Sequence, residues 1–467
     1  MAHRTAQPSA NPKAHIRATD RPWAVWAWAA FWLLLAALTL ALPFIVILSG
    51  DPRPAIGFSR DFALGLGFSA LALAGLQFAL TGRLKPLLHP FGADVVFLFH
   101  RFVSWGAVAL MLGHFGILYL WHHDDLGALN PLVAPPHMTA GRVALLCFVA
   151  LILSSELRQR IGLGYLNWRR LHVALALTGF GCAIWHVLGA GHFTGADGTR
   201  ALWLAVTLIW LGLIAYTRLL RPWRQWRNPW RVIDNRDEGD GIRTLTLRPQ
   251  GQPLSGWRPG QFAWLTVGTS PFSLREHPFT ISTAPEKGPE VSFSIKPLGD
   301  DSARLSQTEP GTIAYIDGPY GQFSIDREAG SDGFVMIAGG VGITPIIANL
   351  HAMQERRDPR SVFVLYANES WDDVAFRDEL TQMAEQIRLT VIHVIQDPPD
   401  DDWPPEGFIV ETGRIDGDML SRLLPQTSRD WPHMLCGPPP MLKALKADLQ
   451  KLGVPVARID SEIFEMV

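Results

Sequence analysis

The sequence predicts an α-helical membrane bundle followed by a small antiparallel β-barrel and a parallel α/β domain. Three observations support this prediction. The 467 residues are 48% hydrophobic and only 18% charged, with 18 Trp, which is too apolar for an ordinary soluble protein. Six long apolar runs precede Trp230. Short alternating runs separated by Pro and Gly follow it.

Charge divides the chain at the same place. Residues 1–230 carry 19 Lys and Arg against 8 Asp and Glu, whereas the remainder carries 22 against 35, and 13 of the 18 Trp lie in the first part. Indole rings favour the bilayer interface. This composition excludes a purely soluble protein, a disordered chain and a nucleic-acid binder that relies on a basic surface. The spacing of Cys147, Cys182 and Cys436 suits neither zinc, an iron–sulfur cluster nor a disulfide framework.

Six membrane spans are expected. The first apolar run carries no charge and is long enough to cross the ~30 Å hydrocarbon core, so we expect a retained helix instead of a cleaved signal. The fourth run is the weakest of the six. The expected spans are residues 23–50, 62–81, 95–121, 141–155, 171–189 and 201–217.

Basic residues predict the orientation of these spans. Lys and Arg gather in the N-terminal tail and in alternate loops, whereas the opposite loops hold only Arg53, Arg60, Arg142 and Arg200. By the positive-inside rule, both termini and the acidic half face the cytoplasm. We therefore expect a multi-pass protein of the bacterial inner membrane whose loop at residues 122–125 faces outward.

Four histidines lie inside the expected spans, His100 and His114 in the third and His172 and His186 in the fifth. Each pair is separated by 14 positions. In an α-helix, with 100° and 1.5 Å per residue, two residues 14 positions apart point within about 40° of the same direction and lie about 21 Å apart along the axis. Because both spans run from inside to outside, His100 comes level with His172, and His114 with His186.

Paired imidazoles at two levels predict two bis-histidine iron sites, each holding a b-type haem. Histidines that only pack between helices are the alternative, but ionisable groups are costly in hydrocarbon and usually functional there. With both axial positions taken, the irons would pass single electrons and bind no substrate. Trp105 and Trp185 lie between the two levels, where lipid-facing or interhelical packing is the expected role.

The second half of the chain predicts two further domains. Alternating runs at 242–247, 262–267, 291–295 and 312–316 indicate the barrel. Strands at 334–338, 362–366, 389–395 and 432–436, alternating with helices, indicate the parallel α/β domain. The expected division is a cytoplasmic tail 1–22, a membrane domain 23–222, a barrel 228–330 and an α/β domain 331–467.

A glycine-rich turn follows the first α/β strand and opens a helix, Gly339-Gly340-Val341-Gly342-Ile343-Thr344-Pro345. The glycines let backbone N–H groups approach a pyrophosphate, and the helix N-terminus adds a favourable dipole. A purely structural turn is the alternative. The position after a strand favours a nucleotide site.

Four more motifs occur in a fixed order. They are His277-Pro278-Phe279-Thr280-Ile281-Ser282, Ile295-Lys296-Pro297-Leu298-Gly299-Asp300, Asp317-Gly318-Pro319-Tyr320-Gly321 and Cys436-Gly437-Pro438-Pro439-Pro440-Met441. Together with the histidine pairs, they resemble the ferric reductase and NADPH oxidase family over nearly the whole chain, from about residue 23 to 467. The resemblance implies a six-helix haem core followed by an FAD-binding barrel and a nicotinamide-binding domain.

The resemblance also implies roles for individual residues. FAD would lie against residues 277–282, with its pyrophosphate near residues 296–302, and Cys436 would lie close to the nicotinamide ring. Phe464 would cover the flavin until nicotinamide displaces it, or would be a core aromatic. The implied cofactor contacts are His277, Pro278, Phe279, Thr280, Ser282, Lys296, Gly299, Ser302, Gly339, Gly340, Gly342, Thr344, Pro345, Gly437 and Pro438.

Two departures from the family pattern matter. Asp301 and Ser302 stand where the family often has an aromatic residue and Thr, which weakens the expected phosphate contact at Ser302. The segment 366–370 lacks an Arg to pair with a 2′-phosphate, and Glu369 would repel that group while accepting hydrogen bonds from a ribose. This segment is similar to the NADH-preferring cytochrome b5 reductases. We therefore expect NADH to be favoured over NADPH.

These expectations combine into transmembrane electron transfer from a nicotinamide nucleotide, through FAD and two haems, to an external acceptor. Where the family's oxidases usually carry a further His, four residues after the outer ligand, this chain has Leu118. A ferric chelate is therefore favoured over O2. Arg60, His122 and His123 could build a different outer pocket, although solvated loop residues are the simpler reading of the histidines. The alternative of another class is an electron-supply subunit that docks a periplasmic protein.

Overall fold

The computed structural model describes residues 22–49, 57–85, 92–195, 197–328, 330–399 and 403–462. Contacts divide the chain into two units. One holds residues 25–227 together with Thr269–Glu276, and the other holds the remaining residues from Asn228 onward. The first is the membrane unit and the second is the dehydrogenase unit.

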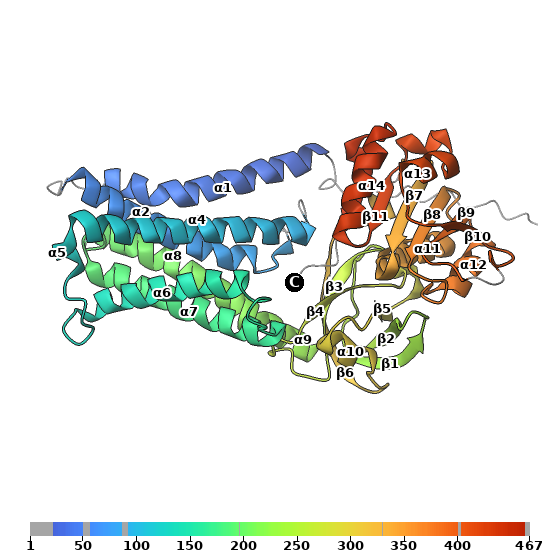
Figure 1. Ribbon diagram of the computed structural model, residues 1–467. Helices are drawn as coiled ribbons and strands as arrows, with labels where there is room; N and C mark the ends of the chain where they lie inside the picture. The colour runs from blue at the N-terminus through green and yellow to red at the C-terminus, as the bar shows by residue number, and fades with distance from the viewer. Residues whose placement is uncertain are drawn as a thin grey trace, which may run out of the picture. The chain divides into compact units, whose positions relative to one another are not determined.

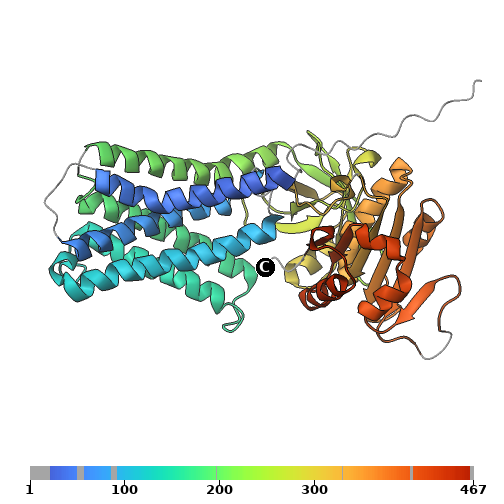
Figure 2. The same ribbon diagram turned by 90° about the horizontal axis from the view of Figure 1, so that it is seen from above.

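The membrane unit is a bundle of long helices (Figure 1, Figure 2). Helix α2 packs along α4, and α6 packs along α7. The helices of this unit are α1 (Pro22–Ser49), α2 (Phe58–Leu80), α4 (Gly92–Trp121), α5 (His123–Leu126), α6 (Pro136–Glu156), α7 (Tyr165–Ala190), α8 (Asp197–Ala215), the π-helical turn Tyr216–Leu220 and α9 (Arg221–Arg227).

Five of the described helices are long and apolar enough to cross a membrane: α2, α4, α6, α7 and α8 with its continuation to Arg227. The chain is thus a membrane protein. The fourth predicted span, which was the weakest, forms the 21-residue helix α6. Its N-terminus carries Pro136, where the missing N–H costs no helical hydrogen bond. The first predicted span forms α1. Its described apolar stretch, Trp26–Leu42, is shorter than those of the five helices above, so a membrane crossing by α1 stays a prediction.

The dehydrogenase unit begins with an antiparallel sheet in the order β4-β3-β6-β1-β2-β5. Its two edge strands meet through a bridge between Ile281 and Phe293, so the sheet closes into the predicted barrel. The strands are β1 (Trp230–Asp237), β2 (Arg243–Pro249), β3 (Phe262–Val267), β4 (His277–Thr280), β5 (Val291–Ile295) and β6 (Ile313–Tyr320), with the short helix α10 (Asp300–Ser306) between β5 and β6.

The second sheet is parallel throughout, in the order β10-β9-β8-β7-β11-β12. Strand order reverses between β7 and β11, which is where open α/β sheets bind ligands. The elements are β7 (Gly333–Gly339), α11 (Ile343–Arg356), β8 (Ser361–Asn368), α12 (Arg377–Ala384), β9 (Leu389–Ile395), β10 (Ile409–Thr412), α13 (Gly417–Leu423), β11 (His433–Cys436), α14 (Pro439–Lys451) and β12 (Ile459–Glu462).

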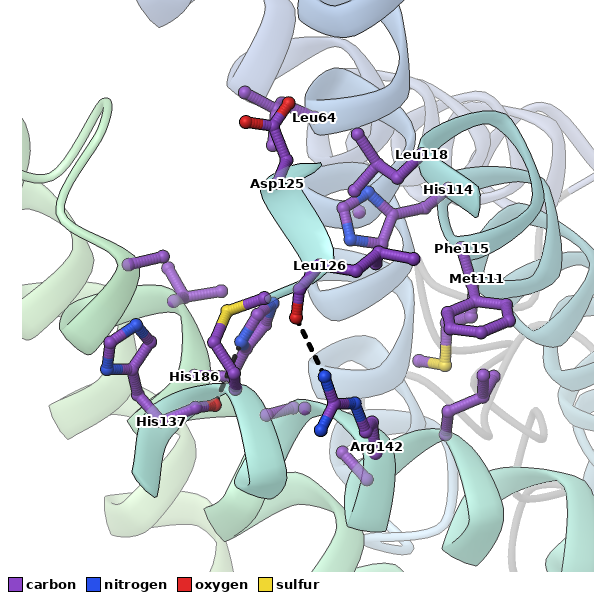
Figure 3. Close-up of a pocket in the computed structure, with 18 of the residues that line it drawn as sticks. Leu64, Met111, His114, Phe115, Leu118, Asp125, Leu126, His137, Arg142 and His186 are labelled. Atoms are coloured by element: carbon purple, nitrogen blue, oxygen red, sulfur yellow. Dashed lines mark hydrogen bonds between the residues drawn. The ribbon is translucent and has the colours of Figure 1, made fainter. Parts of the chain in front are cut away.

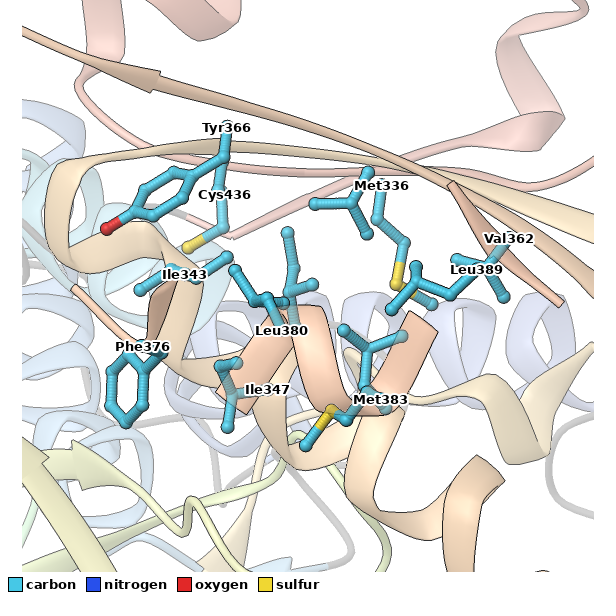
Figure 4. Close-up of a cluster of buried hydrophobic side chains, with 14 of the residues drawn as sticks. Met336, Ile343, Ile347, Val362, Tyr366, Phe376, Leu380, Met383, Leu389 and Cys436 are labelled. Atoms are coloured by element: carbon cyan, nitrogen blue, oxygen red, sulfur yellow. The ribbon is translucent and has the colours of Figure 1, made fainter. Parts of the chain in front are cut away.

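Buried side chains of α11 and α12 cover one face of this sheet (Figure 4). Ile343 and Ile347 of α11 lie beside Leu380 and Met383 of α12 and under Met336 of β7. Helices α13 and α14 contribute to a separate core cluster that includes Leu435 of β11. A sheet buried on both faces explains why β7 and β8 have near-continuous apolar runs.

Candidate functional site

Helices α4 and α7 bring the four membrane histidines together in two pairs. The ring centroids lie 6.5 Å apart for His100 and His172 and 6.4 Å apart for His114 and His186. Two imidazoles on opposite sides of one metal, with metal–nitrogen bonds of about 2.0–2.1 Å, place their ring centroids roughly 6–6.5 Å apart. Both pairs therefore have the separation that a bis-histidine haem requires.

Hydrogen bonds orient the rings of His114 and His186 for metal binding. His114 Nδ1 lies 2.8 Å from the carbonyl oxygen of Ala63, and His186 Nδ1 lies 3.0 Å from that of His137. A carbonyl only accepts, so each Nδ1 carries the hydrogen and donates it. Each Nε2 then keeps its lone pair for a metal, as expected of ligating imidazoles.

The hydrogen bonding of His100 and His172 differs from that of His114 and His186. His172 Nδ1 lies 3.4 Å from Ser155 Oγ, which also accepts a hydrogen bond from Trp168 Nε1 at 3.3 Å. Among the described residues, the buried Nδ1 of His100 has no hydrogen-bond partner. The described residues also contain no group of three or more His, Cys, Asp or Glu that could hold a bare metal ion.

Glycines let neighbouring helices approach the outer imidazoles. A Cβ at Gly67 of α2 would lie 3.0 Å from His114 Nδ1, and one at Gly141 of α6 would lie 2.7 Å from His186 Nδ1. A larger residue at Gly141 would push the ring away from its present position. These two helices thus set the positions of the His114 and His186 rings.

A cavity of about 440 Å³ opens beside His114 and His186 (Figure 3). Arg142 donates to the Leu126 carbonyl oxygen at 2.7 Å, and Arg60 pairs with Asp125 at 2.7 Å. The cavity wall includes both rings and an apolar surface from α2, α4, α6 and α7, with polar residues Arg60, Asp124, Asp125, His137, Arg142 and His192. A largely apolar slot with a polar rim suits a haem, whose macrocycle is apolar and whose propionates are charged.

Sequence reasoning missed part of this cavity. His137 and His192 line it, whereas His122, for which a solvated loop position was the simpler expectation and an outer pocket the alternative, contacts Ser59 Oγ through its Nε2 at 2.8 Å. His137 lies four residues before the fourth expected span, 141–155, and His192 lies three residues after the fifth, 171–189, so polar residues that flank the spans were the available signal. Leu118 is buried and lines the cavity.

Trp105 and Trp185, for which lipid-facing or interhelical packing is the expected role, do not belong to the buried core between the two histidine levels. Trp105 and Trp185 are 47% and 56% exposed within the described structure, and Trp105 Nε1 donates to Glu156 at 3.3 Å. The interior instead holds Phe180 of α7 against Trp210 of α8, with ring centroids 5.2 Å apart. Gly75 makes room for Trp210, since a Cβ there would lie 2.1 Å from its ring.

In the barrel, the predicted flavin segment forms β4 and the two residues after it. His277, Pro278 and Phe279 are half-buried, whereas Thr280 and Ser282 are buried. Thr280 Oγ1 has no partner among the described residues. A buried hydroxyl without a partner is costly, so a polar group of a bound flavin would complete this site.

The predicted pyrophosphate contacts are engaged within the chain. Lys296 forms an ion pair with Asp240. Burial raises the pKa of the Asp240 carboxyl, although this ion pair opposes the shift. Ser302 Oγ accepts hydrogen bonds from the backbone N–H groups of Leu298 and Gly299, at 3.0 and 2.9 Å. A phosphate at this place would have to share or displace these partners.

The glycine turn and the cysteine motif meet at the carboxyl ends of β7 and β11. A Cβ at Gly342 would lie 2.2 Å from the Cys436 carbonyl oxygen, and one at Gly339 would lie 2.7 Å from Met441 Sδ. These two glycines therefore allow close backbone packing. Gly340 has a φ of +52° and open space around its Cβ position, which leaves this position to approach a nucleotide.

Other predicted nucleotide contacts lie at the same edge. Cys436 is fully buried, and burial, with a contribution from Glu462, raises the pKa of its thiol well above the usual range. The thiol is therefore neutral. Thr344 Oγ1 donates to the Val341 carbonyl at 3.1 Å and stabilises the turn. Glu369 is exposed directly after β8, and Phe464 lies outside the described residues.

Two family models match the chain. The model of the ferric reductase like transmembrane component matches residues 66–183, a range that contains His100, His114 and His172. The model of the oxidoreductase NAD-binding domain matches residues 336–447, which contains the glycine turn and Cys436. The first part of the chain is thus similar to ferric reductase transmembrane components, and the last part to oxidoreductase NAD-binding domains. His186 lies just beyond the transmembrane match.

Curated relatives are similar to about a third to a half of this chain. NADH-cytochrome b5 reductase 1 of Lodderomyces elongisporus is 33% identical over 173 residues, which cover 36% of the chain and 55% of the relative. The flavohemoprotein of Oceanobacillus iheyensis is 28% identical over 252 residues, 52% of the chain and 60% of the relative. The chain thus spans little more than half the length of these relatives.

Solved structures give further similarities. The flavohem-like FAD/NAD-binding domain of nitric oxide dioxygenase from Vibrio cholerae is 26% identical, with a TM-score of 0.43 over 50% of this chain and 98% of that one. Flavohemoglobin from Malassezia yamatoensis is 17% identical, with a TM-score of 0.46 over 87% of this chain and 98% of that one.

Proposed function

We propose that this ferric-reductase-like protein is a transmembrane oxidoreductase that passes electrons from cytoplasmic NAD(P)H, through FAD and two bis-histidine b haems, to an external acceptor, with a ferric chelate favoured. The observation that carries the proposal is the pairing of four membrane histidines at nearly equal centroid separations of 6.5 and 6.4 Å. Packing alone gives no reason for two such pairs on the same two helices.

Each part of the chain would contribute a distinct task. The four imidazoles hold iron, Thr280 and Ser282 meet the flavin, and the glycine turn with Gly437 and Pro438 receives the nucleotide. Bound flavin converts two-electron to one-electron chemistry, and six-coordinate haem carries one electron at a time. The neutral Cys436 thiol borders the nicotinamide position without adding charge. No acid–base residue is required.

The acceptor preference follows from the outer cavity. Leu118 places an apolar side chain where a hydrogen-bond donor would be needed to hold oxygen near the outer haem. The cavity rim, with Asp124, Asp125, His137 and two arginines, offers groups that contact a charged metal chelate. Reduction of O2 to superoxide is the alternative outcome.

Membranes containing the protein test this proposal directly. NADH oxidation is measured with O2, with a ferric chelate and with neither, while haem spectra are recorded. We expect haem reduction in all three cases and fast steady turnover only with the chelate. Turnover with O2 alone would assign the oxidase activity. Haem that stays oxidised while NADH is consumed would contradict the electron path.

Variants of the outer ligands test the path residue by residue. His114→Ala or His186→Ala should abolish acceptor reduction and leave reduction of the flavin by NADH unchanged, because the flavin step precedes the haems. His123→Ala, which removes an outer-loop histidine packed on Tyr119, is the matched control. Wild-type acceptor rates in the His186 variant would refute the proposed wiring.

NADH is the proposed nucleotide because Glu369 lies exposed at the carboxyl end of β8, where it would repel a 2′-phosphate. Wild-type protein should show kcat/KM for NADH at least about tenfold above that for NADPH, a difference of about 1.4 kcal/mol. Glu369→Gln should narrow this ratio, whereas Asp418→Asn, a surface carboxylate on α13, should not. A wild-type preference for NADPH would contradict the proposed role of Glu369.

A second candidate function is electron supply to a docked periplasmic protein. The connection between α5 and α6 exposes three apolar side chains, with Leu132 93% exposed beside Val133 and Leu129. Exposed apolar clusters mark interaction surfaces. Leu132→Asp should then abolish acceptor reduction in intact cells while haem reduction by NADH stays normal. Unchanged acceptor reduction in this variant would exclude the docking role.

A further inference from the structure

Helix α11 connects the nucleotide turn to the barrel. It begins directly after Gly342, and its buried polar side chains include Asn349 and His351. Asn349 Oδ1 accepts a hydrogen bond from the backbone N–H of Ile325 at 2.9 Å, and its Nδ2 donates to the Pro345 carbonyl at 2.7 Å. The helix that opens at the nucleotide turn is thus bonded to the segment that leaves β6.

His351 extends this connection to the flavin segment. Its Nδ1 lies 2.8 Å from the Ser282 carbonyl oxygen, and its Nε2 lies 2.7 Å from Glu379 Oε1 of α12. Both partners of the ring are acceptors when Glu379 is ionised. Burial alone would raise the pKa of Glu379, but the hydrogen bond and charge of His351 bring it below the usual value. The Ser282 carbonyl oxygen can only accept, so Nδ1 of His351 carries a hydrogen and donates it.

Ser282 is held from three directions at once. Its N–H donates to the Ser292 carbonyl at 2.8 Å, its Oγ accepts from Ser294 Oγ at 3.0 Å, and its carbonyl accepts from His351. The first two bonds come from the barrel itself. Only the third ties this end of β4 to the nucleotide-binding helix.

We propose that His351, held by Glu379, is a positioning residue that fixes the flavin-binding strand β4 against helix α11 and thereby sets the geometry of hydride transfer between nicotinamide and flavin. This inference rests on the proposed function. A small displacement between reacting groups can slow a reaction by about 100-fold, so one buried bond at this place has a large effect on rate without touching substrate.

His351→Ala in the full-length, flavin-loaded protein tests the proposal. Two quantities are measured: the rate of flavin reduction by NADH with its KM, and backbone hydrogen exchange in residues 277–284. We expect reduction to slow by about tenfold or more, KM for NADH to change less than about twofold, and exchange in this segment to increase. His351→Gln should restore part of the rate, because its amide can still donate to Ser282.

Arg356→Gln is the matched control. Arg356 joins the other end of α11 to the barrel through Glu286, at 2.7 Å, and Asp326, so this variant removes a half-buried connection that does not involve Ser282. It should change neither the flavin reduction rate nor exchange in residues 277–284. If His351→Ala and Arg356→Gln had equal effects, His351 would contribute only to general stability, and the proposal would be overturned.

The outcomes separate this inference from the function on which it rests. If neither nucleotide reduces the flavin of the wild-type protein, the proposed function fails, while the exchange comparison still shows whether His351 fixes β4. If His351→Ala does not fold, His351→Leu, which fills the site but donates no hydrogen bond to Ser282, carries the same test. Wild-type exchange and wild-type rates in the variant that folds would overturn the proposal.

Discussion

Glu276 shows how a single carboxyl is fixed by distant residues. Within the membrane unit, its Oε1 lies 2.6 Å from Arg83 Nη2 and also pairs with Arg169, which donates to the Leu274 carbonyl at 2.8 Å. The side chain is 14% exposed. Burial alone would raise the pKa of Glu276, but the two guanidinium groups lower it to about 2. The next residue, His277, begins β4.

This shift predicts a pH-dependent stability. The pKa of Glu276 is about 2 in the folded protein and near the ordinary value of 4.5 in the unfolded chain, so the ion pair stabilises the fold above pH 4.5. That contribution, about 3 kcal/mol, is lost as pH falls from 4.5 towards 2. Glu276→Gln should lower the unfolding midpoint at pH 7 and flatten its pH dependence.

Unfolding of the purified protein in detergent at pH 7 and pH 3 measures this effect. Asp378→Asn is the control, because its carboxyl is 90% exposed and should leave both midpoints unchanged. A Glu276→Gln midpoint equal to that of the wild type at pH 7 would show that the ion pair adds no net stability.

At the scale of elements, the glycine turn illustrates two different uses of one residue type. Gly342 lies against the backbone of Cys436, which cannot yield, whereas Gly340 has a left-handed φ and open space around it. The turn therefore serves packing at one glycine and, by our proposal, ligand approach at the other. Sequence alone assigns both glycines to the nucleotide.

Alanine variants should separate these uses. Gly342→Ala places a methyl group on the Cys436 carbonyl and should destabilise the dehydrogenase unit by about 3 kcal/mol. Gly340→Ala should cost about 1–2 kcal/mol through its backbone conformation and raise the KM for NADH severalfold. Chemical denaturation and steady-state kinetics measure the two effects. A fully stable Gly342→Ala variant would contradict the close packing.

Some strands follow a sequence pattern that predicts them, whereas others do not. The strands at 262–267 and 291–295 match β3 and β5, in which every residue is buried, because short apolar runs between turn residues indicate buried strands. Strands β10 and β12 were not predicted. β12 reads Ile-Asp-Ser-Glu and is only half-buried, so it carries no apolar period. It is a strand because β11 offers it a free hydrogen-bonding edge.

At the scale of the whole molecule, the net charge of −2 is the sum of a basic membrane part and an acidic soluble part. Basic loops predict that the dehydrogenase unit faces the cytoplasm and the connection between α5 and α6 faces outward. Proposed electron flow across the membrane requires this arrangement, since nicotinamide nucleotides are cytoplasmic and the acceptor is external.

Cysteine labelling in intact cells tests the orientation. Leu132→Cys should react with a membrane-impermeant maleimide from outside, whereas Asp418→Cys should react only after the membrane is permeabilised. The wild-type protein is the control, because Cys147 and Cys436 are buried and Cys182 is half-buried. Labelling of Asp418→Cys in intact cells would reverse the predicted topology and the direction of electron flow.

The sequence by itself determined the properties that repeat along the chain: membrane spans, the 14-residue histidine spacing and the order of barrel and parallel domain. Each follows from a local period or composition, which depends on the helix or strand itself and not on the elements that pack against it. Tertiary structure alone decided which distant groups meet. Glu276 pairs with Arg83 and Arg169, His351 holds Ser282, and His137 enters the outer cavity, because such contacts depend on how whole helices pack, and packing leaves no period in the sequence.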